Sequence, residues 1–127
     1  MSIRISPDQN QPSAAIEISL EKPLPDYDLL QLDQPTPRDV DVILVSQGFR
    51  DLVDDARGVL TDMLSQTGLE ISQLTGAICP GEDDVYRPGL WIVLRDPHAR
   101  PKTTLPVAIQ DGIASIAAKL AERLQLG

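Results

Sequence analysis

Apolar residues recur three and four positions apart from Phe49 to Gln66, which is the spacing of one buried face of an α-helix. Gly68 follows where a glycine in the left-handed conformation commonly ends a helix. Ser46 precedes the pattern, and its hydroxyl is suited to accept a backbone N–H as the helix N-cap. The pattern therefore predicts an amphipathic helix over residues 49–66, with a polar face rich in aspartate.

A second helical pattern covers the C-terminal part of the chain. Thr104 is expected to cap this helix, and Pro106 is tolerated in its first turn because the N–H that proline lacks has no partner there. We expect the helix to span residues 105–126. Its apolar face consists of Ile109, Ile113, Ile116, Ala117, Leu120 and Leu124.

Four further segments have the composition of β-strands. Residues 14–20 alternate between apolar and polar side chains, and 39–45 end in a continuous apolar run. Residues 69–79 alternate at first and then slip in phase, which predicts an irregular strand with a bulge at Gly76. Residues 89–95 form the strongest apolar strand pattern.

The order strand, strand, helix, strand, strand, helix predicts an α+β two-layer sandwich. About four strands would form a mostly antiparallel or mixed sheet, with the helices 49–66 and 105–126 packed on one face. A parallel crossover through the strand at 39–45 is the alternative that makes the sheet mixed. The predicted core consists of Val42, Leu44, Leu52, Ala56, Leu60, Leu64, Trp91, Val93, Ile113, Ile116 and Leu120.

The length of 127 residues is that of one domain. Residues 1–13 are expected to be a flexible N-terminal segment, because the stretch from Ser6 to Ser13 is polar and contains two prolines. Residues 14–127 are then a single α+β domain. Its connection over residues 21–38 contains four prolines and several leucines. The prolines argue against a helix or a central strand, and we expect a long, ordered connection instead.

The composition restricts the class of partner. The chain has 19 acidic and 11 basic residues, a net charge of −8, and the acids are concentrated in residues 1–84. Such a surface repels phosphate backbones, and aromatic residues for base stacking make up only 3% of the chain. We expect no direct binding of nucleic acid, and a basic protein as the partner.

The expected cellular compartment is inferred from features that the sequence does not show. Its single cysteine excludes an internal disulfide, and no apolar run approaches the length of about 18 residues that spans a membrane. The first residues do not resemble a secretion signal. We expect a cytoplasmic protein, bacterial in style, that neither crosses nor binds a membrane.

Catalytic and ligand-binding motifs are weak. Cys79 and His98 are the lone residues of their types and bracket a strand, which keeps a thiolate–imidazole pair apart. The Ser46–Gln47–Gly48 turn lacks the further glycines and the lysine of a phosphate-binding loop. Residues 82–84 are three consecutive acids, unlike the alternating ligands of a calcium loop. We expect no catalytic residue, no metal and no cofactor.

These patterns favour a non-enzymatic protein-binding domain, such as an inhibitor, immunity or accessory-subunit protein that engages a basic partner. The candidate partner-binding residues share one face of the helix 49–66, and they are Asp51, Asp54, Asp55 and Asp62. One alternative is a small enzyme or ligand-binding domain that uses Ser46 or Cys79. Another is an inhibitor that mimics nucleic acid with these aspartates together with Asp39 and Asp41.

Overall fold

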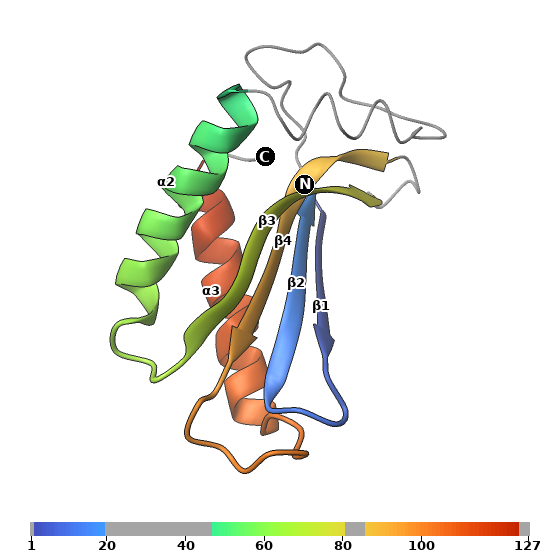
Figure 1. Cartoon of the computed structure of the whole chain (residues 1–127), viewed down its shortest axis with the longest axis vertical. Coiled ribbons are helices and arrows are strands. Elements are labelled where there is room, and N and C mark those ends of the chain that lie inside the picture. Colours follow the sequence, from blue (N-terminus) through green and yellow to red (C-terminus); the bar gives the residue numbers. More distant parts are fainter. Residues whose placement is uncertain (1, 20–46, 81–85, 125–127) are drawn as a thin grey trace.

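The computed structural model describes residues 2–19, 47–80 and 86–124 of the chain. Its elements are β1 (Ser2–Pro7), β2 (Ser13–Ser19), α2 (Gln47–Leu64), β3 (Glu70–Pro80), β4 (Tyr86–Arg95) and α3 (Val107–Arg123) (Figure 1). The predicted strand at 39–45 and the connection 21–38 lie outside the described residues.

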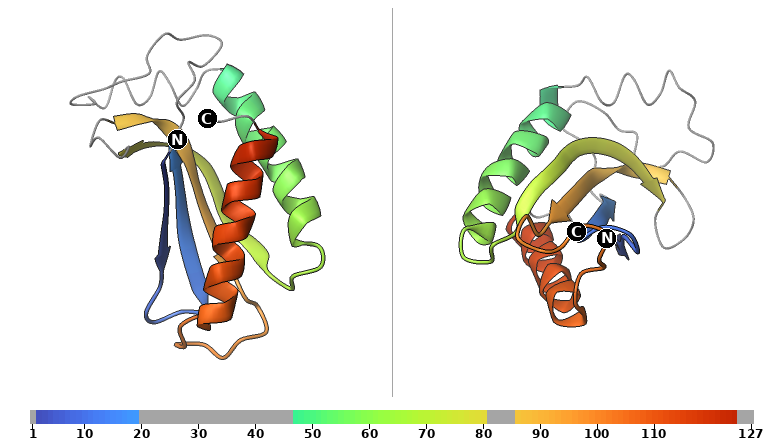
Figure 2. Two further views of the ribbon diagram at one scale, coloured as in Figure 1. Left: turned by 180° about the vertical axis from the view of Figure 1, so that it is seen from behind. Right: turned by 60° about the horizontal axis from the view of Figure 1, so that its bottom comes forward.

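One antiparallel sheet forms the first layer of the fold, with the strand order β1-β2-β4-β3. Both helices form the second layer on the same face of the sheet, as the two views in Figure 2 show. Helix α2 lies against β3, α3 lies against β1 and β2, and the helices contact each other. The predicted α+β two-layer sandwich with two helices on one face is therefore confirmed.

The core lies between the sheet and the two helices. Helix α2 contributes Ala56, Leu60 and Leu64, and α3 contributes Ile113 and Leu120, all buried as predicted. The sheet contributes Ala14, Ile16, Ile18, Leu74, Leu90, Ile92 and Leu94. Leu52 and Ile116 were predicted to be buried but are only partly so, at the margin of the core. Val42 and Leu44 lie outside the described residues.

The prediction for the inner face of β4 was wrong. Trp91 and Val93 are half-buried on the face away from the helices, whereas Leu90, Ile92 and Leu94 are completely buried. All residues from Leu90 to Leu94 are apolar, so the alternation of the strand does not indicate which set faces the core. The pairing with β2 decides it, because Ile16 lies opposite Ile92 and Ile18 lies opposite Leu90.

The expectation of a flexible segment over residues 1–13 was also wrong. Ser2–Pro7 form strand β1, in which Ile3 lies opposite Ile18 and Ile5 lies opposite Ile16, and both packed isoleucines adjoin the core. The turn that follows is ordered by hydrogen bonds from the backbone N–H of Asp8 to the Ser13 carbonyl (2.9 Å) and of Asn10 to the Asp8 side chain (2.8 Å). The polar residues that suggested a flexible segment therefore belong mainly to the turn between β1 and β2.

Helix α2 has the predicted length but begins two residues earlier, whereas α3 is shorter than predicted and begins two residues later. Helix α2 spans Gln47–Leu64, and Gly68 follows it with a φ of +78°, in the left-handed region that favours glycine. Thr104 does not cap α3. Pro106 occupies the N-cap position without a side-chain hydrogen bond, and the Thr104 hydroxyl instead donates to the Gln9 carbonyl at 2.9 Å.

The irregularity in β3 lies earlier than predicted. The register with β4 shifts between Ile71, opposite Leu94, and Gln73, opposite Val93, so the extra residue is Ser72 rather than Gly76. A bulge at this position allows Ile71 and Leu74 to share the inner face although they are three residues apart. The phase slip in the sequence thus predicted the irregularity but not its place.

Candidate functional site

The acidic face of α2, defined by Asp51, Asp54, Asp55 and Asp62, is exposed along its whole length. The helical rotation of about 100° per residue places the four carboxylates on one side, and they extend over about 16 Å of the helix axis. The opposite side of the helix is anchored in the core by Ala56, Leu60 and Leu64. The structure therefore brings the four predicted residues together on one outward surface.

Two arginines flank this acidic face. Arg50 precedes Asp54 by one helical turn, and both side chains are exposed. Arg57 turns toward the sheet, because its Nη2 donates to the Leu74 carbonyl of β3 at 3.5 Å. The acidic face therefore has basic residues along one margin and keeps a negative excess along its centre, which is the arrangement that attracts a basic surface.

The residues of the enzyme alternative are not brought together. Cys79 pairs with Arg87 near one end of the β3–β4 ladder, whereas His98 follows Arg95 at the other end. Eight residues of strand correspond to roughly 26 Å, far beyond the reach of a thiolate–imidazole pair. His98 is exposed, and its backbone N–H donates to the Asp96 carboxylate at 2.9 Å. Ser46, residues 82–84 and the mimic residues Asp39 and Asp41 lie outside the described residues.

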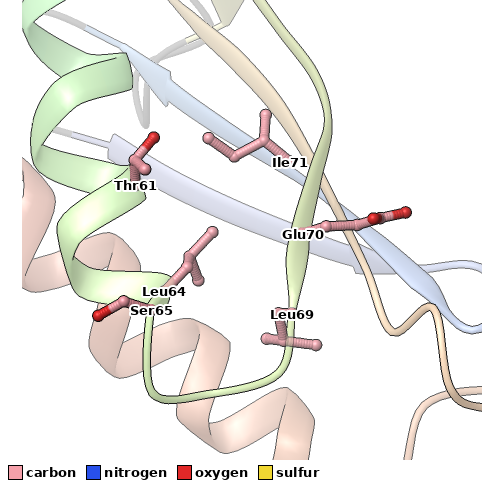
Figure 3. Close-up of a pocket in the computed structure, with 6 residues that line it drawn as sticks. All are labelled: Thr61, Leu64, Ser65, Leu69, Glu70 and Ile71. Atoms are coloured by element: carbon pink, nitrogen blue, oxygen red, sulfur yellow. The ribbon is translucent and has the colours of Figure 1, made fainter.

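A cavity of about 400 Å³ opens between the end of α2 and the start of β3. Its lining is mostly apolar, from Leu64, Leu69 and Ile71 (Figure 3). The Thr61 and Ser65 hydroxyls at its edge donate to helix carbonyls, at 2.7 and 2.8 Å. The Glu70 side chain points away from α2 in Figure 3. Among the described residues that line the cavity, no carboxylate, imidazole or thiol is directed inward.

Four basic residues lie at the end of β4 and in the loop that follows it. Arg95, His98, Arg100 and Lys102 are all exposed. Arg95 lies 3.9 Å from Glu70, and both side chains are about 51% exposed, so this ion pair is of the weak surface kind. The connection after β4 is fastened to the β1–β2 turn by a hydrogen bond from the Asp96 N–H to the Pro12 carbonyl at 2.9 Å.

Within the part of the chain that the structure describes, no three His, Cys, Asp or Glu side chains come together to hold a metal ion. Neither described helix is both long and apolar enough to cross a membrane. Comparison of the chain with models of protein families, with curated proteins and with solved structures finds no match.

Proposed function

We propose that this chain is a non-enzymatic protein-binding domain whose acidic α2 face engages a basic partner. The observation that supports the proposal is the exposure of Asp51, Asp54, Asp55 and Asp62 on one side of a helix that is fixed to the core by its other side. A rigid element that presents fixed charges loses little conformational freedom on binding.

The energetics of the helix support the same interpretation. Like charges one turn apart destabilise a helix by a few tenths of a kcal/mol per pair, and Asp51–Asp54 and Asp51–Asp55 are such pairs. Packing of the core does not require Asp54, Asp55 or Asp62, since their side chains are exposed. Attraction of a basic partner is a role for this face that needs the charges themselves. An inhibitor, an immunity protein or an accessory subunit could bind a basic partner through such an acidic face.

The Asp54→Asn/Asp55→Asn variant tests the proposal. The partner is first captured from a lysate of the native cells at low and at high salt, and its association is then followed by stopped-flow kinetics. We expect the on-rate at low salt to fall about threefold to tenfold and the salt dependence to flatten, because steering by charge acts on association. Removal of two like charges leaves thermal stability unchanged or slightly higher.

A matched control removes two exposed acids elsewhere. Asp111→Asn/Glu122→Gln makes the same change of net charge on α3, where both side chains are exposed. Its effect on the on-rate should be much smaller than that of the α2 variant. Equal on-rates and equal salt slopes for wild type and the α2 variant would show that the acidic face is only a solvated surface.

Loss of the candidate nucleophile and base should have little effect. We expect Cys79→Ser and His98→Ala to bind the captured partner within a few-fold of wild type, because Cys79 lies at one end of the β3–β4 pair and His98 follows its other end. Removal of a general acid, base or nucleophile from an active site typically lowers the rate at least about a hundredfold. A loss of that size in an assay of biological activity, in a variant with an unchanged circular dichroism spectrum, would contradict the non-enzymatic proposal.

A further inference from the structure

The face of the sheet that points away from α2 and α3, here the outer sheet face, is centred on Ala15, Trp91 and Val93. All three are half-buried. The register places Val93 between Ala15 and Gln73, and Trp91 between Glu17 and Thr75, so the centre of the face lies on the two inner strands β2 and β4. No helix or strand among the described elements covers this face, whereas the inner face lies beneath both helices (Figures 1 and 2).

The indole of Trp91 is held in place on the outer sheet face. Its Nε1 donates to the Gln73 Oε1 across the β3–β4 pair at 3.3 Å. A tryptophan that is already positioned loses little side-chain freedom when a partner covers it, and Trp is enriched among the residues that dominate interface energies. The centre of this face thus has the apolar, preorganised character of the middle of an interface.

Among the side chains that the structure describes, the charges around this centre balance, although the chain has a net charge of −8. Arg4 lies directly opposite Glu17 in the β1–β2 register, and Arg95 lies 3.9 Å from Glu70 at another margin. Where a patch that meets a copy of itself carries charges, both signs must be present for them to attract across the interface. The described part of this face offers a strongly basic partner no net negative charge, in contrast to the acidic face of α2.

We propose that a second copy of this chain packs on the outer sheet face, with the two sheets face to face about a twofold axis. The two Trp91 side chains would lie near the axis, and the margins would pair arginine with glutamate across the interface. Two acidic molecules that repel each other elsewhere would meet here through surfaces whose described charges cancel. This interface is independent of the protein-binding function proposed above, because the acidic face of α2 lies on the helix side of the fold.

The size of the face predicts a weak dimer. Four strands about 4.8 Å apart and about seven residues long at about 3.4 Å per residue give roughly 450 Å² per copy. Stable interfaces bury about 800 Å² per partner, so this one belongs to the small, transient class. We therefore expect dissociation in the range of tens to hundreds of micromolar, and the experiment must reach such concentrations.

Sedimentation velocity of the full chain from about 10 to 500 µM tests the proposal. Trp91 is the sole tryptophan of the chain, so its fluorescence reports burial at the interface directly. We expect a concentration-dependent dimer and an emission maximum that moves to shorter wavelength as the dimer forms. Higher salt should strengthen this association by screening the repulsion between two negative molecules, the opposite of its effect on a basic partner.

Two variants test whether the dimer interface lies on the outer sheet face. Val93→Glu puts like charges at the centre of the face, and Thr75→Arg puts them on the exposed edge strand, where folding tolerates a larger side chain. Each should weaken dimerisation at least about tenfold, and Thr75→Arg decides the matter if Val93→Glu does not fold. Val107→Glu is the matched control, since Val107 is 71% exposed on α3. A chain that stays monomeric at 500 µM, or a dimer that persists in both folded variants, would overturn the proposal.

Discussion

Leu60→Ala will lower the free energy of unfolding by about 2–5 kcal/mol. Leu60 is completely buried in α2, a helix that lies against β3 and α3. Truncation loses the favourable free energy of burying the removed carbons. It also leaves a cavity that the surrounding residues of the sheet and the helices can fill only in part. The effect is large because a small domain has a total stability of only about 5–15 kcal/mol.

Chemical denaturation followed by circular dichroism measures this loss, and Val107→Ala is its control. Val107 is 71% exposed on α3, so the same kind of truncation there removes little contact and improves helix propensity. A loss below about 0.5 kcal/mol for Leu60→Ala would mean that the α2 stripe does not face a packed core. The two-layer arrangement would then be wrong, since it depends on that contact.

The helices and their buried faces could be predicted from the sequence because a helix repeats every 3.6 residues. A run such as Ala56, Leu60 and Leu64 fixes the buried side, and the polar side follows without knowledge of any partner element. The acidic face of α2 was therefore predictable, and Asp51, Asp54, Asp55 and Asp62 are all exposed as their spacing requires.

The strands were less predictable, because their buried side depends on pairing. Residues 90–94 are apolar at every position, and only the register with β2 selects Leu90, Ile92 and Leu94 for the core. Strand β1 has six residues, and its apolar positions Ile3 and Ile5 alternate with polar ones. The pattern is short and runs into a polar, proline-containing turn, so the whole segment was interpreted as flexible. The outer sheet face could not be found from the sequence for the same reason. Trp91 and Val93 alternate along β4 with the buried residues Leu90, Ile92 and Leu94, so their side chains lie on the opposite face of the sheet.

Gly89→Ala is the second variant with a large expected effect, and its cause is a close approach of two strands. Gly89 lies opposite Ser19 of β2 and Ala77 of β3. A Cβ built at Gly89 collides with the Ile18 carbonyl oxygen and lies 3.1 Å from the Ser19 Cα. These are backbone atoms of a central strand and cannot move aside as a flexible side chain can. Overpacking typically lowers stability by about 1–3 kcal/mol, and we expect Gly89→Ala at or above the upper end of that range.

Gly112→Ala distinguishes this steric cause from the general preference of glycine for flexible backbone. Nothing lies within 4 Å of a Cβ built at Gly112 in α3, so alanine there should raise stability by about 0.5–1 kcal/mol. Neither glycine has a positive φ in the structure, so neither backbone conformation is one that specifically favours glycine. The same substitution must then shift the unfolding midpoint in opposite directions at the two positions. A Gly89→Ala variant as stable as wild type would mean that β2 and β4 do not pair in this register, and Trp91 and Val93 would lose their place on the outer sheet face.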